Sequence, residues 1–225
     1  MLLAAFEAAV GAADPLKVLA AHLPAPDRLT GGRTVAVGAG KAAASMALAV
    51  EQHWPAQADL SGLVVTRYAH GLPCRRIEVL EAGHPVPDAA GEQAAERILT
   101  LAGGLSSQDL LLVLVSGGGS SLLSLPVAGV PMADLKQVTQ GLLASGAPIQ
   151  EMNIVRKHLS RIQGGRLAQA TSARVLALVV SDVAGDELSA IASGPCAADP
   201  STYRDALEVL RRWNVTAPPC VADHL

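Results

Sequence analysis

The chain has 225 residues, of which 50% are hydrophobic and 16% are charged, and its formal net charge at pH 7 is −3. An apolar content of one half excludes a disordered chain and supplies the core of one large domain or two small ones. Because the net charge is slightly negative, the chain has no basic footprint for nucleic acid or for an anionic membrane, and we expect neither as a partner.

The cysteines and the apolar runs indicate the compartment. The three cysteines are far apart and odd in number, which argues against a disulfide framework and a structural zinc site. No apolar run reaches the about 18 residues of a membrane span. The first six residues lack the basic segment of a signal peptide, and the acidic Glu7 interrupts the apolar stretch that follows such a segment. These features favour a reducing, cytoplasmic environment.

Apolar runs of strand length alternate with helical patterns along the chain. Residues 3–19 predict a helix pair or one kinked helix. Later helices are expected from Lys41 to about His53, from Asp88 as N-cap to Leu101, and over residues 132–143, 153–170 and 203–213, before a polar tail. Strands are expected at residues 34–37, 62–66, 76–80, 109–115 and 174–180. The pattern predicts one α/β domain of three layers, with a doubly wound, mostly parallel, Rossmann-like sheet.

Three unusual loops follow three of these strands, at residues 38–41, 116–121 and 181–186. In an open parallel sheet, ligands bind outside the carboxyl ends of the strands. The coincidence of the loops therefore predicts a binding site at this edge. Each loop also has a simpler structural interpretation.

The first loop contains Gly38 and Gly40 and ends in Lys41 at the expected helix start. Glycines let backbone N–H groups approach an anion, and a helix N-terminus adds partial positive charge. A lysine is unfavourable there unless a phosphate or carboxylate compensates it. The alternative is a tight turn with a solvated lysine, because the spacing matches no complete nucleotide-binding motif.

The second loop is richer in glycine and consists of Ser116, Gly117, Gly118, Gly119, Ser120 and Ser121. Three adjacent glycines lose more backbone entropy on folding than a plain turn requires. Successive N–H groups and hydroxyls can form an anion-binding nest. We predict a phosphate-binding loop, with a structural crossover turn as the alternative.

The third loop offers two carboxylates, Asp182 and Asp186, which suit a Mg²⁺ ion carried in with nucleotide phosphates. Alternatively, Asp182 caps a turn and Asp186 caps a helix through Ala190.

The basic segment after residue 152 offers candidate donors to an acidic substrate, namely Asn153, Arg156 and Lys157. The alternative is that they form a solvated basic face. Spacing leaves the roles of His84 and His158 open.

Taken together, the loops resemble the type 2 glycerate kinase family, whose members carry a C-terminal MOFRL domain. The matching stretches are VGAGKAAASMA, GHPVPDAAG, LVSGGGSSLL, NIVRKHLSRIQGGRLA and SDVAGDELSAIASGP, which occur in the family's order. Two departures from the family pattern are Cys196 and Gln163, where relatives are expected to have Thr and Lys.

The resemblance implies an enzyme that uses ATP and Mg²⁺ to phosphorylate D-glycerate at its 2-hydroxyl, giving 2-phosphoglycerate. It places the family's catalytic lysine on Lys41 and its nucleotide loop on residues 116–121. Phosphoryl transfer depends on positioning and charge neutralisation, which glycine nests, a lysine and a metal can supply.

Two other functions stay open. Members of the family are often named hydroxypyruvate reductase, but no acidic residue follows at the spacing of an NAD-binding motif, since Asp59 precedes its strand. The third hypothesis is a remnant that binds nucleotide or sugar-acid anions without turnover.

Because relatives are nearly twice as long, we expect residues 1–214 to be the N-terminal domain, residues 215–225 to begin the interdomain linker, and the MOFRL domain to be absent. We then expect little turnover from this chain alone.

Overall fold

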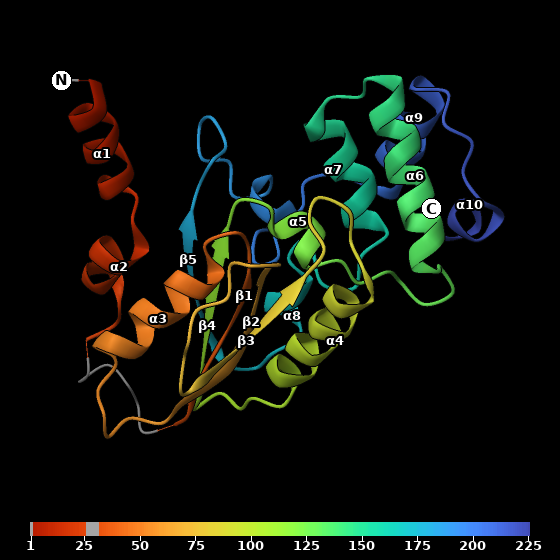
Figure 1. The fold of residues 1–225 in the computed structure, drawn as a ribbon. Helices are drawn as coiled ribbons and strands as arrows, with labels where there is room; N and C mark the ends of the chain where they lie inside the picture. The colour runs from red at the N-terminus through yellow and green to blue at the C-terminus, as the bar shows by residue number, and fades with distance from the viewer. Residues whose placement is uncertain (1, 26–31) are drawn as a thin grey trace.

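The computed structural model describes residues 2–25 and 32–225, and its centre is a five-stranded parallel sheet. The strand order is β3-β2-β1-β4-β5 (Figure 1). Every strand expected from the sequence is present, with these bounds: β1 Thr34–Ala39, β2 Leu60–Arg67, β3 Ile77–Ala82, β4 Leu110–Ser116 and β5 Arg174–Val180.

Helices cover both faces of this sheet, which confirms the predicted three-layer α/β fold. The central strands β1 and β4 are buried along their whole length. α3 (Ala43–His53) packs on one face with Met46 and Val50, and α4 (Ala89–Gly103) packs on the other with Ala95 and Ile98 (Figure 1). Asp88 caps α4 as expected, since its side chain accepts a hydrogen bond from the Gly91 amide.

The strand order reverses between β1 and β4. From β1 the chain proceeds to β2 and β3 on one side, whereas β4 and β5 lie on the other. The loops that follow β1 and β4 therefore diverge and leave a crevice at the carboxyl edge, where ligands of open α/β sheets bind.

Four further helices form a separate group at one end of the sheet, which we call the helical lobe (Figure 1). Its own core includes Val138, Leu142, Val155, Val209 and Val221. The helices of the lobe are α6 Met132–Ser145, α7 Ile149–His158, α9 Tyr203–Arg212 and α10 Pro219–His224.

Several expected helices differ in the structure. The helix expected over residues 153–170 is divided, because α7 ends at His158 and α8 (Arg166–Gln169) begins only after Gly164 and Gly165, whose φ values are 61° and 83°. The expected polar tail contains α10, whose Val221 is buried in the lobe. No helix runs from Asp186 to Ala190; a short 3₁₀ helix, η3, follows at Ile191–Ser193.

The start of the chain confirms the expected helix pair and its break near Pro15, with α1 at Leu2–Ala12, α2 at Pro15–Val18 and the 3₁₀ helix η1 at Leu19–His22. The remaining short helix, α5 (Gly119–Leu122), follows β4. Within residues 2–25 and 32–225, no helix combines the length and the apolar character that a membrane crossing requires.

Candidate functional site

The three loops predicted as a site meet at the carboxyl edge of the sheet. Hydrogen bonds of the backbone fix the turn that carries Lys41. Its amide donates to the Gly117 oxygen at 2.9 Å, and the Thr66 hydroxyl donates to the Lys41 oxygen at 3.3 Å. The Ala42 amide donates to Ser116 Oγ at 3.0 Å. The turn after β1 is therefore fastened to the loop after β4.

Gly38, Gly40 and Ser116 build this junction, although the sequence suggested that they bind an anion. Gly38 packs on the Leu114 backbone of β4. Gly40 has a φ of 145°, and a Cβ there would lie 2.1 Å from Ser116 Oγ. None of the three lines the pocket described below. Their arrangement indicates a positioning role, because they set where Lys41 stands. α3 begins at Ala43, so Lys41 precedes the helix.

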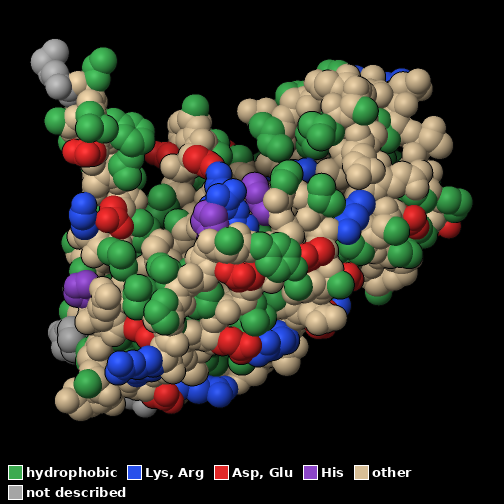
Figure 2. Space-filling model, in the orientation of Figure 1, with side chains coloured by type: hydrophobic (Ala, Val, Ile, Leu, Met, Phe, Trp, Pro, Cys, Tyr) green, Lys and Arg blue, Asp and Glu red, His purple; other side chains and the backbone are tan. Residues whose placement is uncertain are grey.

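The Lys41 ammonium is available to a ligand. Its Nζ lies 3.8 Å from Asp182 Oδ2, and the two side chains are 45% and 59% exposed. An exposed pair at this distance contributes little, about 0–1 kcal/mol, and so competes weakly with an incoming anion. Figure 2 shows Lys, Arg and His side chains gathered at the base of the hollow between the sheet and the helical lobe.

The glycine loop, residues 116–121, has no room for side chains at its centre. Gly118 has a φ of 86°, and a Cβ there would lie 2.8 Å from His84 Nε2. A Cβ on Gly117 would lie 2.1 Å from Asp182 Oδ2. Within the described part of the chain, no backbone hydrogen bond occupies the amides of Gly118 and Gly119. These donors can therefore serve an anion.

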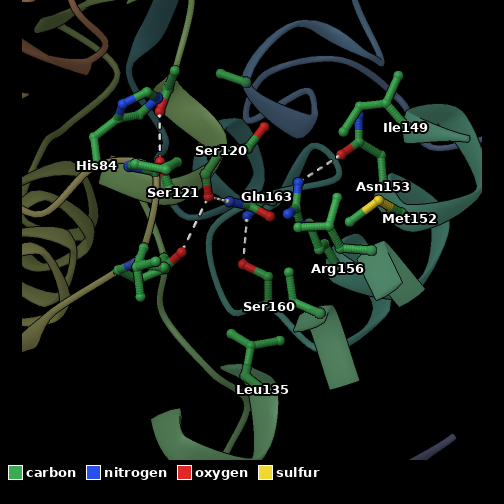
Figure 3. A pocket seen from close by; sticks show the side chains of 18 of the residues that line it. His84, Ser120, Ser121, Leu135, Ile149, Met152, Asn153, Arg156, Ser160 and Gln163 are labelled. Carbon is green, nitrogen blue, oxygen red and sulfur yellow. Dashed lines mark hydrogen bonds between the residues drawn. The ribbon is translucent and has the colours of Figure 1, made fainter. Parts of the chain in front are cut away.

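A pocket of about 620 Å³ lies between the glycine loop and the helical lobe (Figure 3). Gly118, Ser120 and Ser121 of the predicted loop line one wall, whereas Gly117 and Gly119 do not. The buried Gln163 supports this wall, because its Nε2 donates to the oxygens of Ser120 and Leu123, both at 2.9 Å. The sequence marked Gln163 only as a departure from a family pattern, and its position under the loop could not be seen there.

Arg156 and Asn153 line the opposite wall, on α7 (Figure 3). Arg156 Nη1 lies 3.4 Å from Asn153 Oδ1, and among the described residues no carboxylate forms an ion pair with Arg156. Burial lowers the pKa of Arg156. A desolvated guanidinium without a carboxylate partner is unfavourable on its own, so this geometry favours an anionic ligand. The buried Asn153 also accepts a hydrogen bond from Ser193 Oγ at 3.3 Å.

Lys157 does not reach the pocket, contrary to the sequence prediction. It is buried on another side of α7, where its Nζ lies 2.7 Å from Asp199 Oδ1. Asp199 also accepts hydrogen bonds from the amide and hydroxyl of Ser201. His158 is buried beside this pair and packs edge-on against Tyr203. This cluster fastens the segment after η3 to α7.

The two aspartates predicted as metal ligands are not equivalent. Asp182 lines the pocket, whereas Asp186 is exposed on a turn, has a φ of 51° and does not line it. Among the described residues, no group of three or more His, Cys, Asp or Glu side chains could hold a metal ion. Asp182 alone suits a Mg²⁺ ion whose other ligands are phosphate oxygens and water.

His84 stands at the mouth of the pocket, in the loop between β3 and α4, and its ring faces Gly118. Burial lowers the pKa of His84, and the positive charges of Lys41 and Arg67 lower it further. The ring is therefore neutral at pH 7 and can accept a proton or a hydrogen bond.

The fold and the pocket define an α/β domain with a crevice at the switch point of its sheet, lined by amides and a guanidinium that could bind an anion. The chain belongs to the family described as Domain of unknown function (DUF4147), which matches residues 1–225.

Several curated proteins are similar to this chain. A glycerate 2-kinase of Pyrococcus horikoshii is 40% identical over 216 residues, which cover 92% of this chain and 48% of that protein. A D-glycerate 2-kinase of Thermotoga maritima is 46% identical over 185 residues, covering 81% and 44%. A protein of Agrobacterium vitis with the provisional name hydroxypyruvate reductase is 52% identical over 214 residues, covering 95% and 48%. The chain thus spans about half the length of these relatives.

Two solved structures share the fold. The PH0495 protein of Pyrococcus horikoshii matches with a TM-score of 0.90 at 37% identity, covering 99% of this chain and 53% of that one. A glycerate kinase of Thermotoga maritima matches with a TM-score of 0.80 at 41% identity, covering 95% and 53%.

Proposed function

We propose that this chain supplies the nucleotide-binding part of a glycerate 2-kinase, which transfers a phosphoryl group from ATP to the 2-hydroxyl of D-glycerate. The observation that carries the proposal is the placement of the glycine loop and Arg156 around one crevice, with Lys41 beside the loop and, among the described residues, no carboxylate paired with Arg156. The names of the kinase relatives support the same activity. In this proposal, the N-terminal domain extends beyond residue 214, because α10 packs on the helical lobe through the buried Val221, and the linker to a second domain would follow it.

Each group has a role that its environment supports. The amides of Gly118 and Gly119 bind phosphate oxygens, and Lys41 neutralises the charge of the transferring phosphoryl group. Arg156 binds an anionic group of the substrate or the nucleotide. Asp182 would hold Mg²⁺ together with the phosphates, and that ion would supply further charge neutralisation.

The transfer joins the 2-hydroxyl oxygen of glycerate to the γ-phosphorus and breaks the bond to the oxygen that bridges the β- and γ-phosphates. ADP leaves with that oxygen. The hydroxyl proton passes to His84, which is neutral because burial and the nearby cations lower its pKa.

Hydroxypyruvate reduction with NADPH is the second candidate. β2 ends at Arg67, and an arginine at this place in a Rossmann-like fold can bind the 2′-phosphate of NADP. This function does not, however, require the three consecutive glycines after β4 or a partly buried cation in the pocket.

Parallel assays separate the two candidates. Coupled ADP release is measured with D-glycerate, ATP and Mg²⁺, and NADPH oxidation is measured with hydroxypyruvate. Both assays use the 225-residue chain and the same chain extended to the length of its relatives. We expect ADP release from the extended protein and no NADPH oxidation. The reverse result would replace the kinase with the reductase.

Nucleotide binding by the 225-residue chain tests the glycine loop directly. Gly118→Val places a branched side chain against His84 and Lys41, and we expect ATP binding to be lost. Gly129→Val is the matched control, because Gly129 has a φ of 85° but nothing within 4 Å of its added Cβ. Both variants carry similar backbone strain, so unchanged ATP affinity in a folded Gly118→Val protein would contradict the phosphate-binding role.

A further inference from the structure

The pocket has two chemically different ends. Gly118, Ser120, Ser121 and Arg156 supply hydrogen-bond donors at one end. At the other end, α6, α7 and the turn between them present five aliphatic side chains, beside the polar Lys136, Thr139 and Gln140 of α6, and we call these five the apolar end. It consists of Leu135, Leu143, Ala147, Ile149 and Met152.

A small polar substrate does not account for the apolar end. Glycerate has three carbons, all of which carry oxygen, so it gains nothing from aliphatic walls. A volume of about 620 Å³ lies within the range of about 300–1,000 Å³ that is typical of sites for much larger ligands. Of the two ligands of a kinase, only the nucleotide carries a broad apolar ring.

The apolar end is also incompletely covered. Leu143 is 67% exposed and Ile149 is 53% exposed, although both line the pocket. Behind them, Leu135 and Met152 are buried and form part of the core of the helical lobe. A flat ring laid between α6 and α7 would cover the exposed side chains and rest on an ordered wall.

The two ends are joined by Arg156. Met152 and Arg156 are four residues apart on α7 and therefore lie on the same helix face. Figure 3 shows Arg156 directed into the pocket, between Met152 and the glycine-loop side marked by Ser120 and Gln163. A ligand that reaches from the loop to the apolar end thus passes Arg156, as a nucleotide does when its phosphates bind one end and its base the other.

We infer that the apolar end between α6 and α7 binds the purine base of the nucleotide, with Arg156 beside the phosphates. Thr139 and Gln140 on α6 offer polar groups at the border of the base site. This inference rests on the proposed function, because it assigns the base of the nucleotide that the kinase would use.

The first test compares ATP with inorganic tripolyphosphate in calorimetric titrations of the 225-residue chain. We expect ATP to bind at least tenfold more tightly, because only ATP carries the base. Equal affinities would overturn the inference and leave the phosphate-binding loop intact. Failure of both ligands to bind would overturn the proposed function as well. A clear preference for ATP, together with no kinase activity in the extended protein, would overturn the proposed function alone.

The second test alters the apolar end without adding charge. In the double variant Leu143→Ser and Ile149→Ser, both replaced side chains are exposed, so the fold is expected to persist. We expect ATP affinity to fall at least tenfold and tripolyphosphate affinity to stay the same. Leu207→Ser on α9 is the control, because Leu207 is 42% exposed and outside the pocket.

A photoreactive nucleotide maps the base directly. With 8-azido-ATP, we expect adducts on α6 or α7 that excess ATP prevents. ATP-sensitive adducts elsewhere, or none, would overturn the inference. If instead the double variant changes only the sedimentation of the protein and not its preference for ATP, the apolar end is a contact between copies of the chain and the inference is wrong.

Discussion

The two walls of the pocket are built in different ways. The wall at the sheet edge presents backbone amides and hydroxyls, with Lys41 beside it, and hydrogen bonds between the loops after β1 and β4 fix their positions. The wall on the helical lobe presents side chains, namely Arg156 and the aliphatic residues of α6 and α7. Backbone groups bind any phosphate, whereas side chains distinguish one ligand from another. We therefore assign charge binding mainly to the sheet and ligand selection mainly to the lobe.

The walls also depend on different supports. The sheet wall follows two fully buried strands. The lobe wall stands on its own hydrophobic core and on the buried pair of Lys157 with Asp199. A change to a support of the lobe should therefore affect stability, whereas a change to an exposed group of the sheet wall should affect chemistry.

The largest expected effect concerns the support of the lobe. Lys157→Met leaves Asp199 with hydrogen bonds from Ser201 and with His158 nearby but without its ammonium partner, and breaking such a buried pair is expected to lower the free energy of unfolding by about 3–5 kcal/mol. Urea denaturation measures the change. The control is Lys17→Met, because Lys17 pairs with Asp14 at 3.7 Å but is 66% exposed, and its expected loss is below about 1 kcal/mol. Equal losses in the two variants would contradict the supporting role.

The same pair gives a pH dependence. Burial raises the pKa of Asp199, but hydrogen bonds from Lys157 and Ser201 outweigh burial, so that its pKa lies below the usual 3.8. The stability that this carboxylate contributes is thus present above about pH 3.8 and is lost as the pH falls through its lowered pKa. Between pH 5 and pH 3, the wild type should lose more stability than Lys157→Met.

The second effect concerns the sheet wall. Lys41→Met keeps an unbranched side chain of similar bulk and removes its charge. By analogy with the loss of a preorganised donor, it should reduce transition-state stabilisation by about 2–4 kcal/mol, which is a fall in kcat of roughly 30-fold to 1,000-fold. Coupled ADP release from the extended protein measures it, with stability expected to change little because Lys41 is 45% exposed. A rate within a few fold of wild type would make Lys41 a solvated lysine.

Arg156→Met should separate binding from stability. The variant loses a charged donor in the pocket, and we expect ATP affinity to fall about tenfold to 100-fold, or about 1.5–3 kcal/mol. The free energy of unfolding should stay the same or rise, because the removed guanidinium is partly buried without a carboxylate partner among the described residues. Calorimetry and urea denaturation check the two parts. Arg212→Met is the control, since Arg212 pairs with Glu151 outside the pocket.

The same contrast explains how much the sequence predicted. Unbroken runs such as Leu110–Ser116 predicted the strands, and the loops that follow them predicted the sheet wall. The lobe wall depends on distant contacts. Lys157 and Arg156 are adjacent in sequence, but only the packing of α7 directs one to Asp199 and the other to the pocket. The separation of Asp186 from the pocket likewise depends on a turn with positive φ, which helix periodicity could not indicate.

The smallest expected effect is a shift in the titration of His84, beside the glycine loop of the sheet wall. Burial and the charges of Lys41 and Arg67 hold its pKa below the usual 6.5. Tripolyphosphate bound at the glycine loop would bring negative charge to this ring and favour its protonated form, so the pKa should rise on binding. Removing the nearby cation in Lys41→Met should also raise it in the free protein. Nuclear magnetic resonance of ¹³C-labelled histidine follows both changes, with His84→Gln used to assign the signal. A pKa that is unchanged by tripolyphosphate would place the bound anion away from Gly118.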